Sequence, residues 1–129
     1  MHLKLMTTEG DFKILSISDD KAQVTKPAWF QNGGVGYQIQ SRAGKLEITA
    51  KGSVNGLIKV WLMGVDVRNP SDKTKRVPYW IDYSKLTING ATIFDKVTPT
   101  WHDKAYIYNF DDAKADEEIK FQIEWLTYE

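Results

Sequence analysis

The sequence predicts an all-β protein: an antiparallel β-sandwich of about eight strands, with a jelly-roll topology. Apolar and polar residues alternate with a period of two in segment after segment, whereas the helical period fails nearly everywhere. Turn residues (Gly, Pro, Asn and Asp) separate these short segments, as they do in sandwiches and barrels. The 129 residues contain no cysteine, so packing and hydrogen bonds must stabilise the fold. This length predicts one domain over residues 1–129.

The first half of the chain predicts three strands. We expect residues 1–10 to be a frayed terminus and the first strand to span 11–18. The second strand, 36–41, follows the turn residues 31–34. Residues 45–51 alternate cleanly between two faces, so one half of this strand should be exposed to solvent.

The second half predicts the centre of a sheet, a hairpin and two further strands. Residues 57–64 are almost continuously apolar, which indicates a central strand or burial on both faces. Asn89-Gly90 separates two β-rich arms within 85–94 and predicts a type I′ hairpin turn. Residues 105–110 and 118–126 read as strands. By contrast, 76–85 and 111–120 are expected to be loops with at most a short turn.

Composition excludes several classes of function. The 17 basic residues balance the 17 acidic ones, so the chain lacks the excess of positive charge that is typical of nucleic-acid binders. No apolar window reaches the length of a membrane-spanning helix, and we expect no membrane span. The N-terminus lacks the apolar core of a signal peptide, which favours the cytoplasm, although composition alone leaves the compartment open.

Motifs for catalysis and metal binding are missing from the sequence. Only two histidines are present, so no zinc spacing exists, and no serine lies in a Gly-x-Ser-x-Gly elbow. We therefore predict no catalytic residue, no metal ligand and no cofactor. Two alternatives stay open: calcium held by the acidic segment 109–118, and a glycosidase-like carboxylate pair. Such a pair would come from Asp66, Asp82, Asp95, Asp103, Asp111, Asp112 and Asp116.

Five tryptophans are many for this length. Trp61 and Trp125 fall in apolar strands and are expected to fill the core. Trp29, Trp80 and Trp101 each follow a proline by two residues, in predicted loops. Loop aromatics suit sugar binding because a sugar ring presents a C–H face to an aromatic ring, while adjacent polar groups bind its hydroxyls. In the stretch "TWHD", the competing interpretation is a structural corner in which His102 and Asp103 bond locally.

Three stretches carry a resemblance to a known group: "GLIKVWLMGVDVRN", "VPYWIDYSKLTINGATIFD" and "WHDKAYIY". They resemble the β-sandwich segment at the ends of bacterial glycosyltransferases and related proteins of surface-polysaccharide synthesis, over about residues 36–126. That group has an L-x-L-x-G-x-D-x-R strand, and this chain carries valine at position 60 in place of the first leucine. The resemblance implies an accessory, non-catalytic jelly roll like that of carbohydrate-binding modules. Transferase activity is not implied, because the chain has no room for a nucleotide-sugar domain and contains no Asp-x-Asp motif.

Together these features give one main hypothesis and one rival. The main hypothesis is a glycan-binding accessory domain associated with a catalytic glycosyltransferase domain. Its candidate ligand-binding residues are Asp66, Arg68, Trp80, Asp82, Trp101, His102 and Asp103. The rival is a structural or protein-interaction sandwich, in which the same residues brace the fold and no glycan binds.

Overall fold

The computed structural model describes residues 1–7, 10–26, 35–63, 65–69, 72–95 and 105–128. Within these residues the chain forms strands and no helix, which confirms the all-β prediction, but with eleven strands instead of about eight. The strands are β1 (His2–Thr7), β2 (Phe12–Ile17), β3 (Gln23–Thr25), β4 (Val35–Gln40), β5 (Lys45–Gly52), β6 (Gly56–Met63), β7 (Val65–Asn69), β8 (Asp72–Ile88), β9 (Ala91–Asp95), β10 (Ala105–Ala113) and β11 (Ile119–Tyr128).

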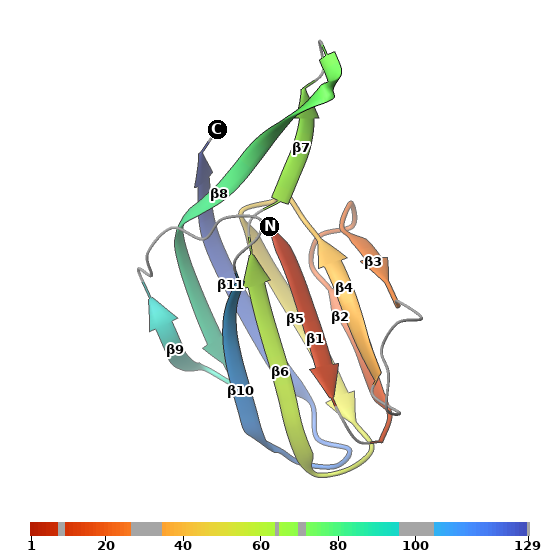
Figure 1. Cartoon of the computed structure of the whole chain (residues 1–129). Coiled ribbons are helices and arrows are strands. Elements are labelled where there is room, and N and C mark those ends of the chain that lie inside the picture. Colours follow the sequence, from red (N-terminus) through yellow and green to blue (C-terminus); the bar gives the residue numbers. More distant parts are fainter. Residues whose placement is uncertain (8–9, 27–34, 64, 70–71, 96–104, 129) are drawn as a thin grey trace.

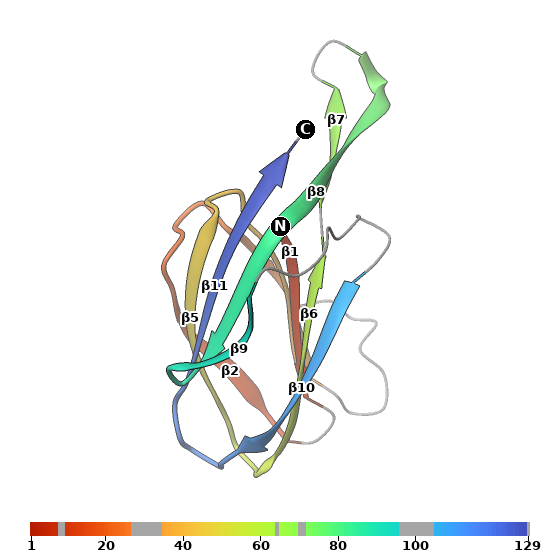
Figure 2. The same cartoon turned by 90° about the vertical axis from the view of Figure 1, so that its left-hand side faces the viewer.

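The strands form two antiparallel sheets that face each other (Figure 1 and Figure 2). The first sheet has the order β10-β6-β1-β4-β3. The second has the order β2-β5-β11-β8-β7, and β9 also pairs with β8. The long strand β8 pairs with β7 along its first half and with β9 near its end. Together, β7 and the first half of β8 extend beyond the sandwich as a two-stranded ribbon. The expected β-sandwich is therefore present.

The strand pairings follow the nested pattern of a jelly roll. The innermost pair along the chain is the hairpin β8–β9, in the second sheet. The next pair outward, β6 with β10, lies in the first sheet. The pair after that, β5 with β11, lies in the second sheet again. A regular jelly roll would then pair β4 with a strand that follows β11. Here β1 occupies that place, antiparallel to both β4 and β6. The N-terminal strand thus completes the first sheet.

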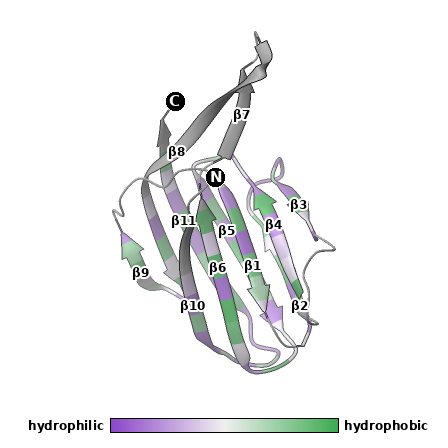
Figure 3. Cartoon of the chain, in the orientation of Figure 1, coloured by the Kyte–Doolittle hydropathy of each residue, from purple (hydrophilic) through white to green (hydrophobic). Residues whose placement is uncertain are grey.

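The core lies between the sheets and consists of the inward half of each alternating strand. Figure 3 shows this alternation as successive green and purple residues along the strands. In β5 and β11, the inward positions are buried and the outward ones are partly or fully exposed, as the sequence predicted for 45–51 and 118–126. The fully buried side chains include Leu3, Leu5, Phe12, Ile39, Leu46, Ile48, Leu62, Leu86, Phe121 and Ile123.

Two sequence predictions about segments are wrong. Residues 1–10 are not a frayed end, because Leu3 and Leu5 have no exposed surface and β1 lies in the middle of its sheet. The outward position of Lys4 is the normal alternation of a half-buried strand. Residues 76–85 are not a loop but part of β8, since Pro78 stands opposite Asp66 in the two-stranded ribbon, where proline is tolerated at a strand edge.

The predicted Asn89-Gly90 turn is confirmed. Both residues have positive φ, 50° and 84°, as a type I′ turn requires, and the turn joins β8 to β9. The Asn89 side chain also accepts a hydrogen bond from the backbone N–H of Lys120, at 2.9 Å. This bond ties the hairpin to β11, the neighbouring strand of the same sheet.

We expect Leu5→Ala to lower the free energy of unfolding by about 2–5 kcal/mol, because it leaves a cavity at the centre of the core. Leu126→Ala is the matched control: Leu126 is 64% exposed, so its loss should change stability by no more than about 0.5 kcal/mol. Urea denaturation of both variants measures the difference. Equal stabilities would show that β1 is not an integral part of the core.

Candidate functional site

The residues predicted to bind a ligand fall in two groups. Asp66 and Arg68 lie in β7, and Trp80 and Asp82 lie in β8, so the hairpin brings the two pairs onto neighbouring strands. Their side chains are outside the part of the chain whose side chains the structure describes. Residues 101–103, with Trp101, His102 and Asp103, lie outside the described residues altogether, as does Trp29. The role of all these residues remains a prediction.

The described residues form an open pocket of about 760 Å³ at one end of the sandwich. We call it the end pocket. The β2–β3 turn and the β4–β5 turn border it, and both turns lie at the same end because β2 and β4 run toward it. The lining residues are Asp19, Asp20, Lys21, Gln23, Gln40, Ser41, Arg42 and Ala43.

Hydrogen bonds hold the two turns of the end pocket together. The Ser41 hydroxyl donates to Oδ2 of Asp19 at 2.6 Å, and the backbone N–H of Lys21 donates to Oδ1 of the same carboxylate at 3.0 Å. The Met1 α-amine donates to the backbone carbonyl of Ser41 at 2.7 Å, and the Ser41 N–H donates back to the Met1 carbonyl at 3.0 Å. Ser41 therefore joins both turns to the start of β1, which gives the pocket a defined shape.

The electrostatics of the end pocket are close to neutral. The hydrogen bond from Ser41, followed by that from the Lys21 backbone, lowers the pKa of Asp19, so its carboxylate stays ionised. Burial, helped by the charge of Arg42, lowers the pKa of the Met1 amine from 8.0 to about 5, so that this amine is uncharged at neutral pH. The two carboxylates are then balanced by Lys21 and Arg42.

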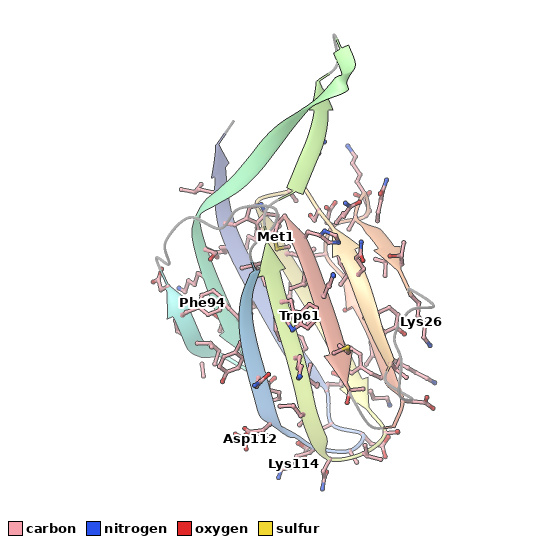
Figure 4. All side chains as sticks on the ribbon, in the orientation of Figure 1. Met1, Lys26, Trp61, Phe94, Asp112 and Lys114 are labelled. Atoms are coloured by element: carbon pink, nitrogen blue, oxygen red, sulfur yellow. The ribbon has the colours of Figure 1, made fainter. Side chains whose placement is uncertain are left out.

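A second surface lies on the outer side of the five-stranded sheet. Trp61 alternates with the buried residues Val60 and Leu62, so it points away from the core and is only partly buried. The prediction that Trp61 fills the core is therefore wrong, whereas Trp125, which is 4% exposed, does so. The continuous apolar run of β6 arises because an outward tryptophan sits between inward aliphatic residues. Figure 4 shows Trp61 on the sheet nearest the viewer.

Neither a metal centre nor a membrane helix is found among the described residues. No group of three or more His, Cys, Asp or Glu side chains in them is placed to hold a metal ion. Nothing helical in the described part of the chain is long and apolar enough to cross a membrane. The acidic segment 109–118 forms the end of β10 and the turn into β11, with Asp112 and Lys114 at the far end from Met1 (Figure 4).

Comparisons with known proteins add no assignment. No protein-family model matches the chain, and neither a curated protein nor a solved structure matches it. The end pocket and the outer face of the five-stranded sheet are therefore the two candidate sites among the described residues.

Sequence reasoning missed the end pocket. Its lining comes from two turns, "SDDK" and "SRAG", which are about twenty residues apart and individually typical of ordinary β-turns. The only signal is the unusual density of hydrogen-bonding side chains in both. Only the arrangement of the strands in the two sheets makes the two turns adjacent.

We expect the stability of the chain with a free Met1 amine to rise as the pH increases from about 5 to 8. The folded amine has a pKa of about 5 and the unfolded one about 8, so the unfolded state binds more protons across this window. Burial also lowers the pKa of His2, which acts in the same direction. The amine alone corresponds to about 4 kcal/mol, at ~1.36 kcal/mol per pKa unit.

Urea denaturation at pH 5, 6, 7 and 8 measures this dependence. His2→Gln is the control that removes the imidazole, and most of the pH dependence should persist in it. The same unfolding free energy at all four pH values would contradict the burial of the amine.

Proposed function

We propose that this chain is a non-catalytic, glycan-binding accessory domain and that it holds its ligand in the end pocket. The observation that carries the proposal is the lining of this pocket, which combines two carboxylates, two cations, two side-chain amides and a hydroxyl in an open, nearly neutral cavity. Carboxylates accept hydrogen bonds, the cations donate them, and amides do both. This mixture suits the many hydroxyl groups of an uncharged sugar.

The charge balance of the pocket disfavours strongly charged ligands. A nucleotide or a phosphate group would meet two carboxylates, and a metal cation would meet Lys21 and Arg42. A polyhydroxylated, uncharged ligand avoids both penalties. Because the pocket is open, it buries only part of the ligand, so the affinity should be modest.

The state of Asp19 does not suit the general acid of a glycosidase. A glycosidase acid must keep its proton near neutral pH, which requires a raised pKa. The pKa of Asp19 is lowered instead, and both of its oxygens already accept hydrogen bonds from Ser41 and Lys21. Asp19 therefore acts as a brace that shapes the pocket.

The motif resemblance supports the biological setting of this proposal. The resemblance to accessory β-sandwiches beside bacterial glycosyltransferases implies that such a domain holds the polysaccharide on which the enzyme acts. We propose that this domain works beside such a catalytic domain. Trp80 of β8 and Trp101 would then contribute further contacts to the sugar chain.

We expect Arg42→Ala to weaken glycan binding by about tenfold or more, because it removes a guanidinium of the pocket lining that can donate hydrogen bonds to sugar hydroxyls. The probe is an array of linear glucose, galactose, rhamnose and N-acetylglucosamine oligosaccharides, and calorimetry then gives the affinity of each one that binds. Lys114→Ala, which removes a cation at the opposite end of the molecule, is the matched control. Binding that is the same in both variants would place the ligand elsewhere.

One observation favours the rival function of protein interaction. The ribbon of β7 and the first half of β8 projects from the sandwich (Figure 1 and Figure 2), and an isolated two-stranded ribbon is marginally stable in water. Docking on a partner would stabilise it. A blank array for the unmodified protein would favour this function over glycan binding.

A further inference from the structure

We propose that the glycan site extends from the end pocket across the outer face of the five-stranded sheet to a second sugar subsite formed by Trp61 and His2. This inference rests on the glycan-binding function proposed above and adds to it. It makes the ligand a chain of several sugar units instead of a single sugar.

The strand register shows that the two places are continuous. Gln40 and Gln23, which line the end pocket, are directly paired between β4 and β3. Gln40 is also paired with His2 of β1, and both alternate with buried residues, so both lie on the outer face. Trp61 of β6 is paired with Lys4, two residues along β1 from His2. A row of polar side chains thus leads from the pocket to the indole.

The length of this row sets the size of the ligand. The strands β4 and β6 are separated by β1, and Trp61 lies two residues along β6 from the residue level with Gln40, so the two residues are about 12 Å apart. One sugar ring in the end pocket does not span that distance. A linear oligosaccharide that lies across the strands reaches both places.

Two polar atoms in this region have no hydrogen-bond partner. Nε1 of Trp61 and Nε2 of His2 are both buried and unpaired in the structure of the described chain. The two residues are diagonal neighbours on adjacent strands, which places their side chains within reach of one ligand. Buried polar groups are nearly always paired in native proteins, so two unpaired ones side by side point to an absent polar partner. Sugar hydroxyls can accept from the indole N–H and bond to the imidazole nitrogen.

The Lys4 side chain forms a cover that a ligand can displace. Its ammonium lies 5.3 Å from the centre of the Trp61 ring in a cation–π contact. A lysine side chain is flexible, so it can move aside and leave the ring to the C–H face of a sugar. The movement would also open the way to the indole N–H.

On the outer face of the other sheet, the side chains that the structure describes pair with one another. There Glu47 accepts a hydrogen bond from the Gln122 amide at 3.1 Å and lies 3.5 Å from the Lys120 ammonium. Its polar side chains thus pair with one another across the strands, as expected of a solvated face. This contrast between the two faces assigns the subsite to the five-stranded sheet.

The test compares two chain lengths, two and five sugar units, of the oligosaccharides on the array described above. We expect Trp61→Ala to weaken binding of the five-unit chain by about tenfold, while binding of the two-unit chain changes less than about twofold. Arg42→Ala should weaken both. Lys59→Ala is the matched control, because Lys59 lies on the same face of β6, two residues further from the pocket. Thermal melting of each variant checks that it folds.

The outcomes separate the two proposals. If Trp61→Ala binds the five-unit chain as tightly as the unmodified protein does while Arg42→Ala does not, the second subsite is overturned and the pocket stands. If Lys59→Ala loses as much affinity as Trp61→Ala, the effect is not specific to the indole and the subsite is again overturned. If no oligosaccharide of either length binds the unmodified protein, both proposals fall together.

Discussion

The burial of the first strand, β1, is the constraint on which the rest of the structure depends. This strand pairs with β4 on one side and β6 on the other, and it places Leu3 and Leu5 in the centre of the core. Without it, two unpaired strand edges would open in the middle of the first sheet. The jelly roll is closed by the start of the chain, in the position where a last strand would otherwise lie.

The same constraint shapes the end pocket. Because β1 is central, Met1, which directly precedes it, reaches the end of the sandwich where the β2–β3 and β4–β5 turns meet. The Met1 amine then bonds to the Ser41 carbonyl, and Ser41 in turn bonds to Asp19. Packing in the core and shape at the pocket are thus linked through one short run of hydrogen bonds. A change that loosens β1 should also loosen the pocket.

The two outer faces of the sandwich differ in how their polar side chains are paired. On the second sheet, charged side chains such as Glu47 and Lys120 neutralise one another across the strands. On the first sheet, an indole and an imidazole interrupt the polar pattern and keep nitrogen atoms that are unpaired. The polar row through Gln40 joins this face to the end pocket. The sheet holds the side chains of this face at the regular spacings of its strands.

The sequence by itself determined the fold class, the alternation of β5 and β11, and the Asn89-Gly90 hairpin, because each depends on local period or on a backbone angle that few residues adopt. It gave misleading signals for β1 and for residues 76–85, where pairing with distant strands overrides a short or proline-containing local pattern. Only the tertiary structure decided that Trp61 faces outward and that the turns at Asp19 and Ser41 form one pocket. The physical reason is that neighbours in a jelly roll lie far apart along the chain, so their contacts leave no mark on local sequence.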